Sequence, residues 1–256
     1  AEDGIRDVER SRGLGDVYKR QTLDRARKQR PLKKLPLNMR VTGWLSPYLI
    51  YIFSKLNIPP NVITFSWILL AFVGFYFMAL GGYSNSVIGI LIYHFALLLD
   101  STDGGVARIL KKTNVAGEFL DRFFSTINRS FILFVLGFGL FKIGQGEIFL
   151  CLGLFSSILL FLENSIKMKT YESLINSNRF DIIKLKYKKN KNIKHNLKFY
   201  IKEAFRPGNH FTLSFFAIIL NLVGLYLYVF SILIFFRFLY LFIKEFSLLK
   251  HTKQQH

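Results

Sequence analysis

Long apolar runs that carry almost no charge are the feature that most constrains the fold of this chain. Hydrophobic residues make up 51% of its 256 residues, and they are concentrated in these runs. A transmembrane helix needs about 20 consecutive apolar residues, whereas a soluble domain spreads its apolar residues at the period of a helix or a strand. We therefore predict an all-α, polytopic membrane protein, and we exclude a disordered, coiled-coil or disulfide-stabilised chain.

The runs predict six transmembrane helices. The first four are Val62–Leu80, Val87 to about Leu110, Ala116–Phe141 and Ile148–Ile166. The stretch Phe211–Leu249 is too long for one span without extreme tilt. We divide it into two spans near Leu225–Val229, which makes residues 61–250 a six-span membrane domain.

Residues 22–60 form a basic cytoplasmic segment that ends in an amphipathic helix. The apolar residues of this helix recur with helical spacing on one stripe: Leu45, Leu49, Ile52, Phe53 and Leu56. The segment is too short and too polar to span, and Pro59-Pro60 ends it. We predict that it lies on the cytoplasmic surface of the membrane, held by this stripe and by its basic residues.

Both ends of the chain are polar. Residues 1–21 contain no apolar run, and Asp16–Gln21 resembles the translation of a transposase end sequence used in preparing sequencing libraries. This segment is either adapter sequence read as protein or a disordered natural terminus, so we expect the protein proper to begin near Thr22. Residues 251–256 form a polar tail.

The charge distribution predicts the orientation. The net charge is +19, and the loop at residues 167–208 is rich in lysine. Because cytoplasmic loops of membrane proteins are enriched in Lys and Arg, we expect both termini in the cytoplasm. We expect the loop to face water and lipid headgroups. We expect no nucleic acid partner. The abundance of Lys, Asn, Ile and Phe indicates an AT-rich genome, and hence a bacterial cell membrane.

Three carboxylates at the cytoplasmic ends of two predicted spans are the strongest sign of chemistry. Asp100 and Asp103 share one face of the second span, and Asp121 enters from the third span after a short loop. Acidic residues inside a span are costly, and their default interpretation is functional. Converging carboxylates repel unless a cation lies among them, and oxygen ligands suit Mg²⁺ or Mn²⁺.

The neighbouring residues indicate a phosphate-containing ligand. Gly104 and Gly117 allow a backbone or a flat ligand to approach closely. Arg108, one turn beyond Gly104, can donate two parallel hydrogen bonds to a phosphate.

These residues have the spacing D-x2-D-G-x2-A-R-x8-G-x3-D, which resembles the signature of the CDP-alcohol phosphotransferases. The matching residues are Asp100, Asp103, Gly104, Ala107, Arg108, Gly117 and Asp121. The family also tends to carry Pro-Asn-x-x-Thr at the start of its first span, which Pro60, Asn61 and Thr64 match. The resemblance covers about residues 22–250.

The resemblance implies a membrane transferase of phospholipid biosynthesis. Such an enzyme moves a substituted phosphate from a CDP-alcohol, such as CDP-diacylglycerol, to an acceptor hydroxyl and releases CMP. It implies Mg²⁺ or Mn²⁺ held by the three aspartates, and a nucleotide slot shaped by Gly104, Ala107 and Gly117. It also implies membrane lipids as surroundings and, often, a homodimer.

The chain departs from the family pattern at one position. The family signature ends in a further Asp, the expected general base, and here that position is Ser125. Serine does not act as a base near pH 7, and loss of a positioned base costs about 10²–10⁴ in rate. Three functions stay open: an active transferase with an altered base arrangement, a non-catalytic relative that acts as a binding or partner protein, and a transporter, against which the Arg108 and Gly117 matches argue.

Two further arginines lie inside predicted spans. Arg129 continues a polar stripe of the third span with Glu118, Asp121 and Ser125. It either meets a phosphate or acidic group of the acceptor, or pairs with a neighbour such as Glu163. Arg237, in the last span, either belongs to a buried ion pair or extends its charged end towards the membrane surface, and we favour the pair.

Overall fold

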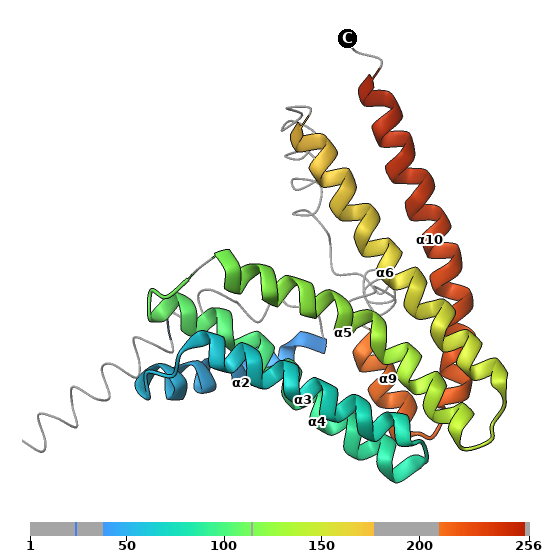
Figure 1. Cartoon of the computed structure of the whole chain (residues 1–256), viewed down its shortest axis with the longest axis horizontal. Coiled ribbons are helices and arrows are strands. Elements are labelled where there is room, and N and C mark those ends of the chain that lie inside the picture. Colours follow the sequence, from blue (N-terminus) through green and yellow to red (C-terminus); the bar gives the residue numbers. More distant parts are fainter. Residues whose placement is uncertain (1–23, 25–37, 114, 177–209, 254–256) are drawn as a thin grey trace, which may run out of the picture. The chain divides into compact units, whose positions relative to one another are not determined.

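The computed structural model describes residue 24 and residues 38–113, 115–176 and 210–253. Within these ranges the chain is helical between its turns, and no strand is present. The helices in chain order are α2 (Asn38–Lys55), α3 (Pro60–Leu80), α4 (Tyr83–Ile109), α5 (Val115–Lys142), α6 (Glu147–Asn176), α9 (His210–Ile219) and α10 (Val223–Lys253) (Figure 1). The prediction of an all-α fold is confirmed.

Five helices of the described ranges are long and apolar enough to cross a membrane, namely α3, α4, α5, α6 and α10. They contain the first four predicted spans and the last one. The remaining predicted span corresponds to α9, which has 10 residues in the described part of the chain and is shorter than a span. The multi-pass character is thus confirmed, and the fifth predicted span, at α9, stays a prediction.

The predicted division near Leu225–Val229 is wrong. The chain turns at residues 220–222, and α10 runs unbroken from Val223. Asn221 has a left-handed backbone with φ of 57°, a conformation that asparagine tolerates better than most side chains. The amide of Leu222 then donates to the carbonyl of Ala217 at 2.7 Å and closes the end of α9. The signal was this single asparagine inside an otherwise apolar run.

The predicted boundary of the basic loop at residue 167 is also wrong. Helix α6 continues to Asn176, ten residues beyond the predicted end at Ile166. Charged pairs one helical turn apart support this extension, because Lys167 contacts Glu163 and Lys169 contacts Glu172 at 3.0 Å. Residues 177–208 of the predicted loop lie outside the described residues, as do the segment 1–21, the basic stretch 25–37 and the end of the polar tail.

The chain divides into two compact units, and the first comprises residues 1–73 and 91–122. In this unit α2 buries Ser46, Ile50 and Ser54, and it leaves Trp44 and Ile52 exposed. Ile50 packs against α4 at Gly105, where an added Cβ would overlap the Ile50 side chain. An apolar surface on α2 is thus free to contact lipid, and its position on the membrane surface stays a prediction.

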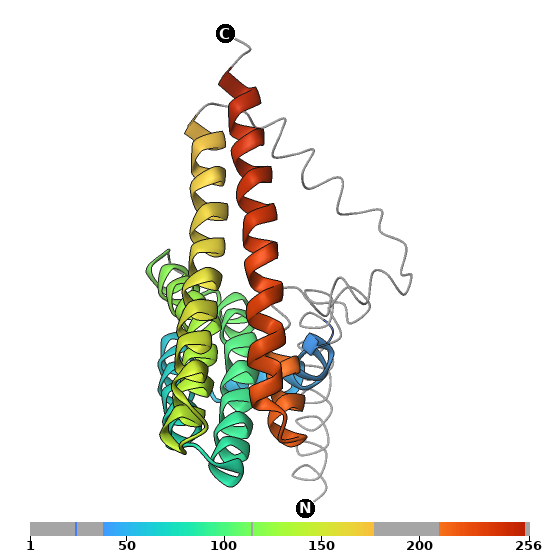
Figure 2. The ribbon, with the colours of Figure 1, turned by 90° about the vertical axis from the view of Figure 1, so that its right-hand side faces the viewer.

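The second unit comprises residues 74–90 and 123–256, and glycines allow its helices to approach closely. A Cβ on Gly137 would overlap the backbone of Phe149, and a Cβ on Gly139 would overlap that of Met78. Helices α6 and α10 run side by side in this unit (Figures 1 and 2). Ser156 and Ser231 join the two helices by a buried hydrogen bond of 2.7 Å.

An ion pair also joins α6 to α10. The Glu163 side chain is fully buried, and its Oε1 lies 3.2 Å from Nη2 of Arg237. Lys167 approaches the same oxygen from the next turn of α6. Arg237 thus belongs to an ion pair, as predicted, in which the Glu163 side chain is buried and the Arg237 side chain is 31% exposed. Among the described residues, the partners of Glu163 are therefore Arg237 and Lys167 and do not include Arg129.

Candidate active site

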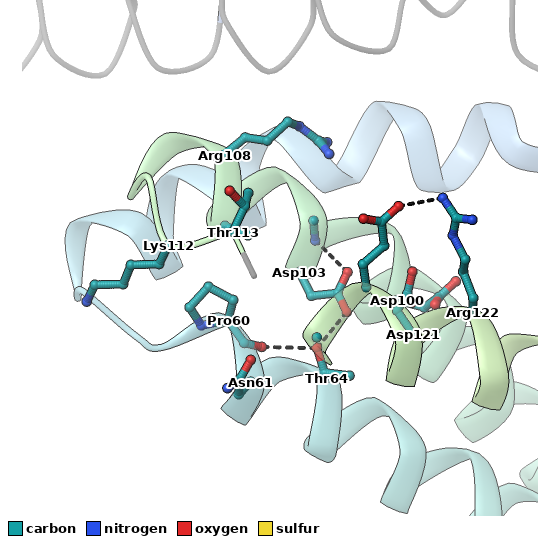
Figure 3. Close-up of a pocket in the computed structure, with 14 residues that line it drawn as sticks. Pro60, Asn61, Thr64, Asp100, Asp103, Arg108, Lys112, Thr113, Asp121 and Arg122 are labelled. Carbon is teal, nitrogen blue, oxygen red and sulfur yellow. Dashed lines mark hydrogen bonds and ion pairs between the residues drawn. The ribbon is translucent and has the colours of Figure 1, made fainter. Parts of the chain in front are cut away.

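A cavity of about 470 Å³ opens within the first unit between α3, the end of α4 and the start of α5 (Figure 3). Its wall combines acidic, basic and small residues. The lining residues are Pro60, Asn61, Thr64, Asp100, Asp103, Gly104, Ala107, Arg108, Lys112, Thr113, Gly117, Glu118, Asp121 and Arg122. A cavity with charges of both signs suits a ligand that carries phosphate together with a counter-cation.

Both carboxylate oxygens of Asp103 accept hydrogen bonds in the cavity. Its side chain is buried, and its Oδ2 accepts a hydrogen bond from the Thr64 hydroxyl at 2.8 Å and one from the Trp67 indole at 3.2 Å. Its Oδ1 accepts from the amide of Gly104 at 2.5 Å. Helix α3 presents both side-chain donors because Thr64 and Trp67 lie three residues apart on one face.

Asp121 differs from Asp103 in its contacts. Its Oδ1 is buried and has no hydrogen-bond partner among the described residues. It lies near enough to Asp103 for the two carboxylates to repel each other. Asp100, half-buried on α4, lines the same cavity. A carboxylate oxygen without a partner beside a second carboxylate is costly unless a cation compensates it.

The donor chemistry of these aspartates fits a divalent cation. Mg²⁺ prefers carboxylate oxygens, and it keeps several positions for water or substrate phosphate. In the side-chain arrangement of the described residues, no group of three His, Cys, Asp or Glu side chains is close enough to hold a metal ion. The buried, unpartnered Oδ1 of Asp121 is the structural observation that favours a cation in this cavity.

Basic residues line the outer part of the cavity. Arg108 lies in the last turn of α4, and Lys112 and Thr113 follow it in the turn towards α5. Lys111 takes a left-handed backbone with φ of 54°, which ends the helix. Lys112 donates to Asn57 at 3.3 Å and thereby connects this turn to the one before α3. Arg122 pairs with Glu118 one turn earlier on α5.

Gly104 and Gly105 have different surroundings although they are adjacent. A Cβ on Gly104 would lie 3.4 Å from Nη1 of Arg108, which is an ordinary contact. A Cβ on Gly105 would overlap Ile50. An alanine at position 105 would therefore force the Ile50 side chain to shift, whereas at position 104 the space faces the cavity.

The structure gathers most of the predicted site residues in this one cavity. Those that line it are Asn61, Thr64, Asp100, Asp103, Gly104, Ala107, Arg108, Gly117 and Asp121. Ser125 and Arg129 are half-buried residues further along α5, in the second unit, and they do not line the cavity. Their predicted roles stay predictions.

Sequence reasoning missed several residues of the site. It did not single out Trp67, Lys112, Thr113 or Arg122. The signal for Trp67 was its position three residues after Thr64, which puts it on the same face of α3. The signal for Arg122 was its position four residues after Glu118, which allows an ion pair on the helix surface.

The fold and the cavity together define a multi-pass helical membrane protein with a cavity lined by charged residues at the ends of its helices. A family model for CDP-alcohol phosphatidyltransferases matches residues 57–188. The chain belongs to this family, and the matched range includes every residue that lines the cavity.

The chain is also similar to part of a bacterial protein. An uncharacterized protein of Aquifex aeolicus (strain VF5) is 34% identical over 96 residues, which are 35% of this chain and 46% of that protein. The chain thus matches less than half the length of this relative.

Proposed function

We propose that this protein transfers a substituted phosphate from a CDP-alcohol, such as CDP-diacylglycerol, to an acceptor hydroxyl and releases CMP. Family membership supports phosphotransfer from a CDP-alcohol in lipid synthesis. The single observation that carries the proposal is that the motif residues of α3, α4 and α5 line one cavity.

The cavity has a suitable group for each part of the donor. Arg108 and Lys112 offer positive charge to the diphosphate, and the arginine can donate two parallel hydrogen bonds. Gly104, Ala107 and Gly117 leave room for the nucleotide, because none has a side chain larger than a methyl group. Asn61 lines the cavity next to Thr64 and offers an amide to the cytosine.

Asp100, Asp103 and Asp121 would hold Mg²⁺ or Mn²⁺ at the diphosphate. When bound, the cation would neutralise the negative charge that develops on the leaving CMP. The hydrogen bonds to Asp103 keep one of these carboxylates oriented before the ligand arrives.

In the transfer, the acceptor oxygen attacks the phosphorus that carries the alcohol. A new P–O bond forms to the acceptor, the P–O bond to CMP breaks, and the bonding electrons leave with CMP. The acceptor proton has to pass to a base. Ser125 stands where the family has that base, so Glu118, a carboxylate of the cavity wall that is paired with Arg122, is the alternative proton acceptor.

Ser125 also favours a second candidate function, a catalytically impaired relative that binds a CDP-alcohol and acts as a partner protein. Binding of a CDP-alcohol requires the cavity and its aspartates, and it does not require a general base. In both candidates we propose cytoplasmic termini, a cavity that opens to the cytoplasm of a bacterial cell, and a homodimer.

The two candidates differ in one assay. Purified protein in detergent micelles is incubated with CDP-diacylglycerol, Mg²⁺ and a panel of acceptors that includes inositol, glycerol 3-phosphate and serine. CMP release that depends on one acceptor supports the transferase. CDP-diacylglycerol binding without CMP release supports the impaired relative, and absence of both contradicts the proposed function.

A further inference from the structure

We propose that Trp67 is a positioning residue for Asp103, and that the Trp67 indole and the Thr64 hydroxyl together fix the orientation of this carboxylate for a divalent cation. The inference deepens the proposed function and rests on its cation site. In this inference Thr64 orients the Asp103 carboxylate. The sequence alone predicts that Thr64 contacts the substrate directly.

The hydrogen-bond geometry around Asp103 carries the first step. Oδ2 accepts two side-chain donors, at 2.8 Å from Thr64 and at 3.2 Å from Trp67. Oδ1 accepts the amide of Gly104 at 2.5 Å. Rotation of the carboxylate about its Cβ–Cγ bond would break all three bonds, so the carboxylate plane is fixed by the fold.

Thr64 alone would hold Asp103 less firmly. A hydroxyl has one proton to donate, and the Thr64 hydroxyl also lies 3.2 Å from the carbonyl of Pro60. Its proton can therefore be directed to either oxygen. The Trp67 indole has one N–H, which points at Asp103 and has no second acceptor in the described structure. Trp67 thus supplies a donor whose acceptor, within the described structure, is Asp103 alone.

Burial explains why the indole keeps this partner. Trp67 is 1% exposed and is the largest fully buried side chain of the described residues. A buried indole N–H that lost its acceptor would stay unsatisfied, because water does not reach it. The packing of the ring therefore determines the direction of the N–H, and the N–H determines the position of Oδ2.

Asp121 lacks the hydrogen bonds that orient Asp103. Its buried Oδ1 has no hydrogen-bond partner among the described residues, whereas both Asp103 oxygens are held. We infer a division of roles in which Asp103 is a fixed ligand and Asp121 is the ligand that a cation completes. Outer contacts of this kind change metal affinity by about 10- to 100-fold when they are removed.

The test measures the binding of Mn²⁺ alone, by the electron paramagnetic resonance signal of the free ion, to full-length protein in micelles. Trp67→Phe removes the N–H, and we expect Mn²⁺ affinity to fall about 10- to 100-fold. Trp44→Phe is the matched control, because Trp44 is 58% exposed on α2 and lies outside the cavity lining. We expect this control to bind Mn²⁺ as the wild type does.

A second pair of variants tests the hydrogen bond from Thr64 to the same carboxylate and leaves the indole in place. Thr64→Val removes the hydroxyl at nearly constant volume, and Thr64→Ser keeps it. We expect weakened Mn²⁺ binding in the first variant and near-wild-type binding in the second. The Trp44→Phe protein adds a direct readout, because Trp67 is then its only tryptophan and its fluorescence should change saturably with Mg²⁺.

The outcomes separate this inference from the proposed function. Wild-type protein that binds Mn²⁺, together with Trp67→Phe and Thr64→Val variants that bind it equally well, would overturn the inference and leave the cation site intact. Variants that lose thermal stability but keep Mn²⁺ affinity would overturn it as well, because the role would then be structural. Wild-type protein without saturable Mn²⁺ binding would overturn the cation site itself and the inference with it.

Discussion

The Thr64 hydroxyl donates a hydrogen bond of 2.8 Å to Oδ2 of Asp103, across 39 positions of the sequence. This contact joins the Pro-Asn-x-x-Thr segment of α3 to the acidic motif of α4 (Figure 3). Two sequence motifs that resemble family signatures are thereby part of one hydrogen-bonded arrangement. We derive four predictions from the cavity and from the ion pair between α6 and α10.

Substitution of Gly104 by alanine should leave the protein folded and weaken binding of the CDP-alcohol. The new Cβ has room beside Arg108 in the protein itself, but it occupies space on the cavity wall. We expect about a tenfold loss of affinity, which equals about 1.4 kcal/mol. Titration of CDP-diacylglycerol by calorimetry measures this change.

The adjacent Gly105→Ala variant is the matched control for that prediction. Its Cβ would overlap Ile50 on α2, so it should lower thermal stability by about 1–3 kcal/mol. Equal stability of the two variants would contradict the packing described here. Unchanged ligand affinity in Gly104→Ala would contradict the assignment of the nucleotide slot.

Substitution of Ser125 by aspartate should raise the rate of CMP release. If the carboxylate restores a positioned base, the expected gain is about 10²–10⁴. Single-turnover rates with the preferred acceptor, or with water in its absence, measure the effect. Ser125→Asn matches the size of aspartate without its charge, so an equal gain in both variants would show that a base is not the cause.

Removal of the buried Glu163 carboxylate should destabilise the second unit. In Glu163→Leu the Arg237 guanidinium loses the partner that lies 3.2 Å away. Loss of a charged hydrogen-bond partner of this kind costs about 1–3 kcal/mol, visible as a lower midpoint of thermal unfolding in circular dichroism. The double variant Glu163→Leu/Arg237→Leu should recover part of this loss, because replacing both charges restores a satisfied interior. A double variant less stable than the single one would argue against the pair as the cause.

The sequence predicts most of the apolar helices, and the residues of its acidic motif lie together in the structure, for identifiable reasons. The apolar runs mark both ends of α3 and α5 to within two residues, because a lipid environment allows little variation in their composition. The fixed spacing from Asp100 to Asp121 places three carboxylates in one cavity, since two helices joined by a short loop bring their ends together.

The remaining features depend on single residues and on contacts that the pattern of apolar runs does not encode. The end of α9 is determined by the left-handed backbone of Asn221. The length of α6 depends on charged pairs beyond its apolar part, such as Lys169 with Glu172. The contact of Trp67 with Asp103 becomes visible only when α3 and α4 pack together, because 36 residues separate the two side chains in the chain.

The central claim is that the aspartate-lined cavity binds a CDP-alcohol together with a divalent cation. Its most direct test is calorimetric binding of CDP-diacylglycerol to wild-type protein and to Asp121→Asn, each with Mg²⁺ and with EDTA. The claim predicts saturable, Mg²⁺-dependent binding by the wild type and at least a tenfold loss in Asp121→Asn, about 1.4 kcal/mol or more. Binding of equal strength in both proteins, with or without Mg²⁺, would contradict it.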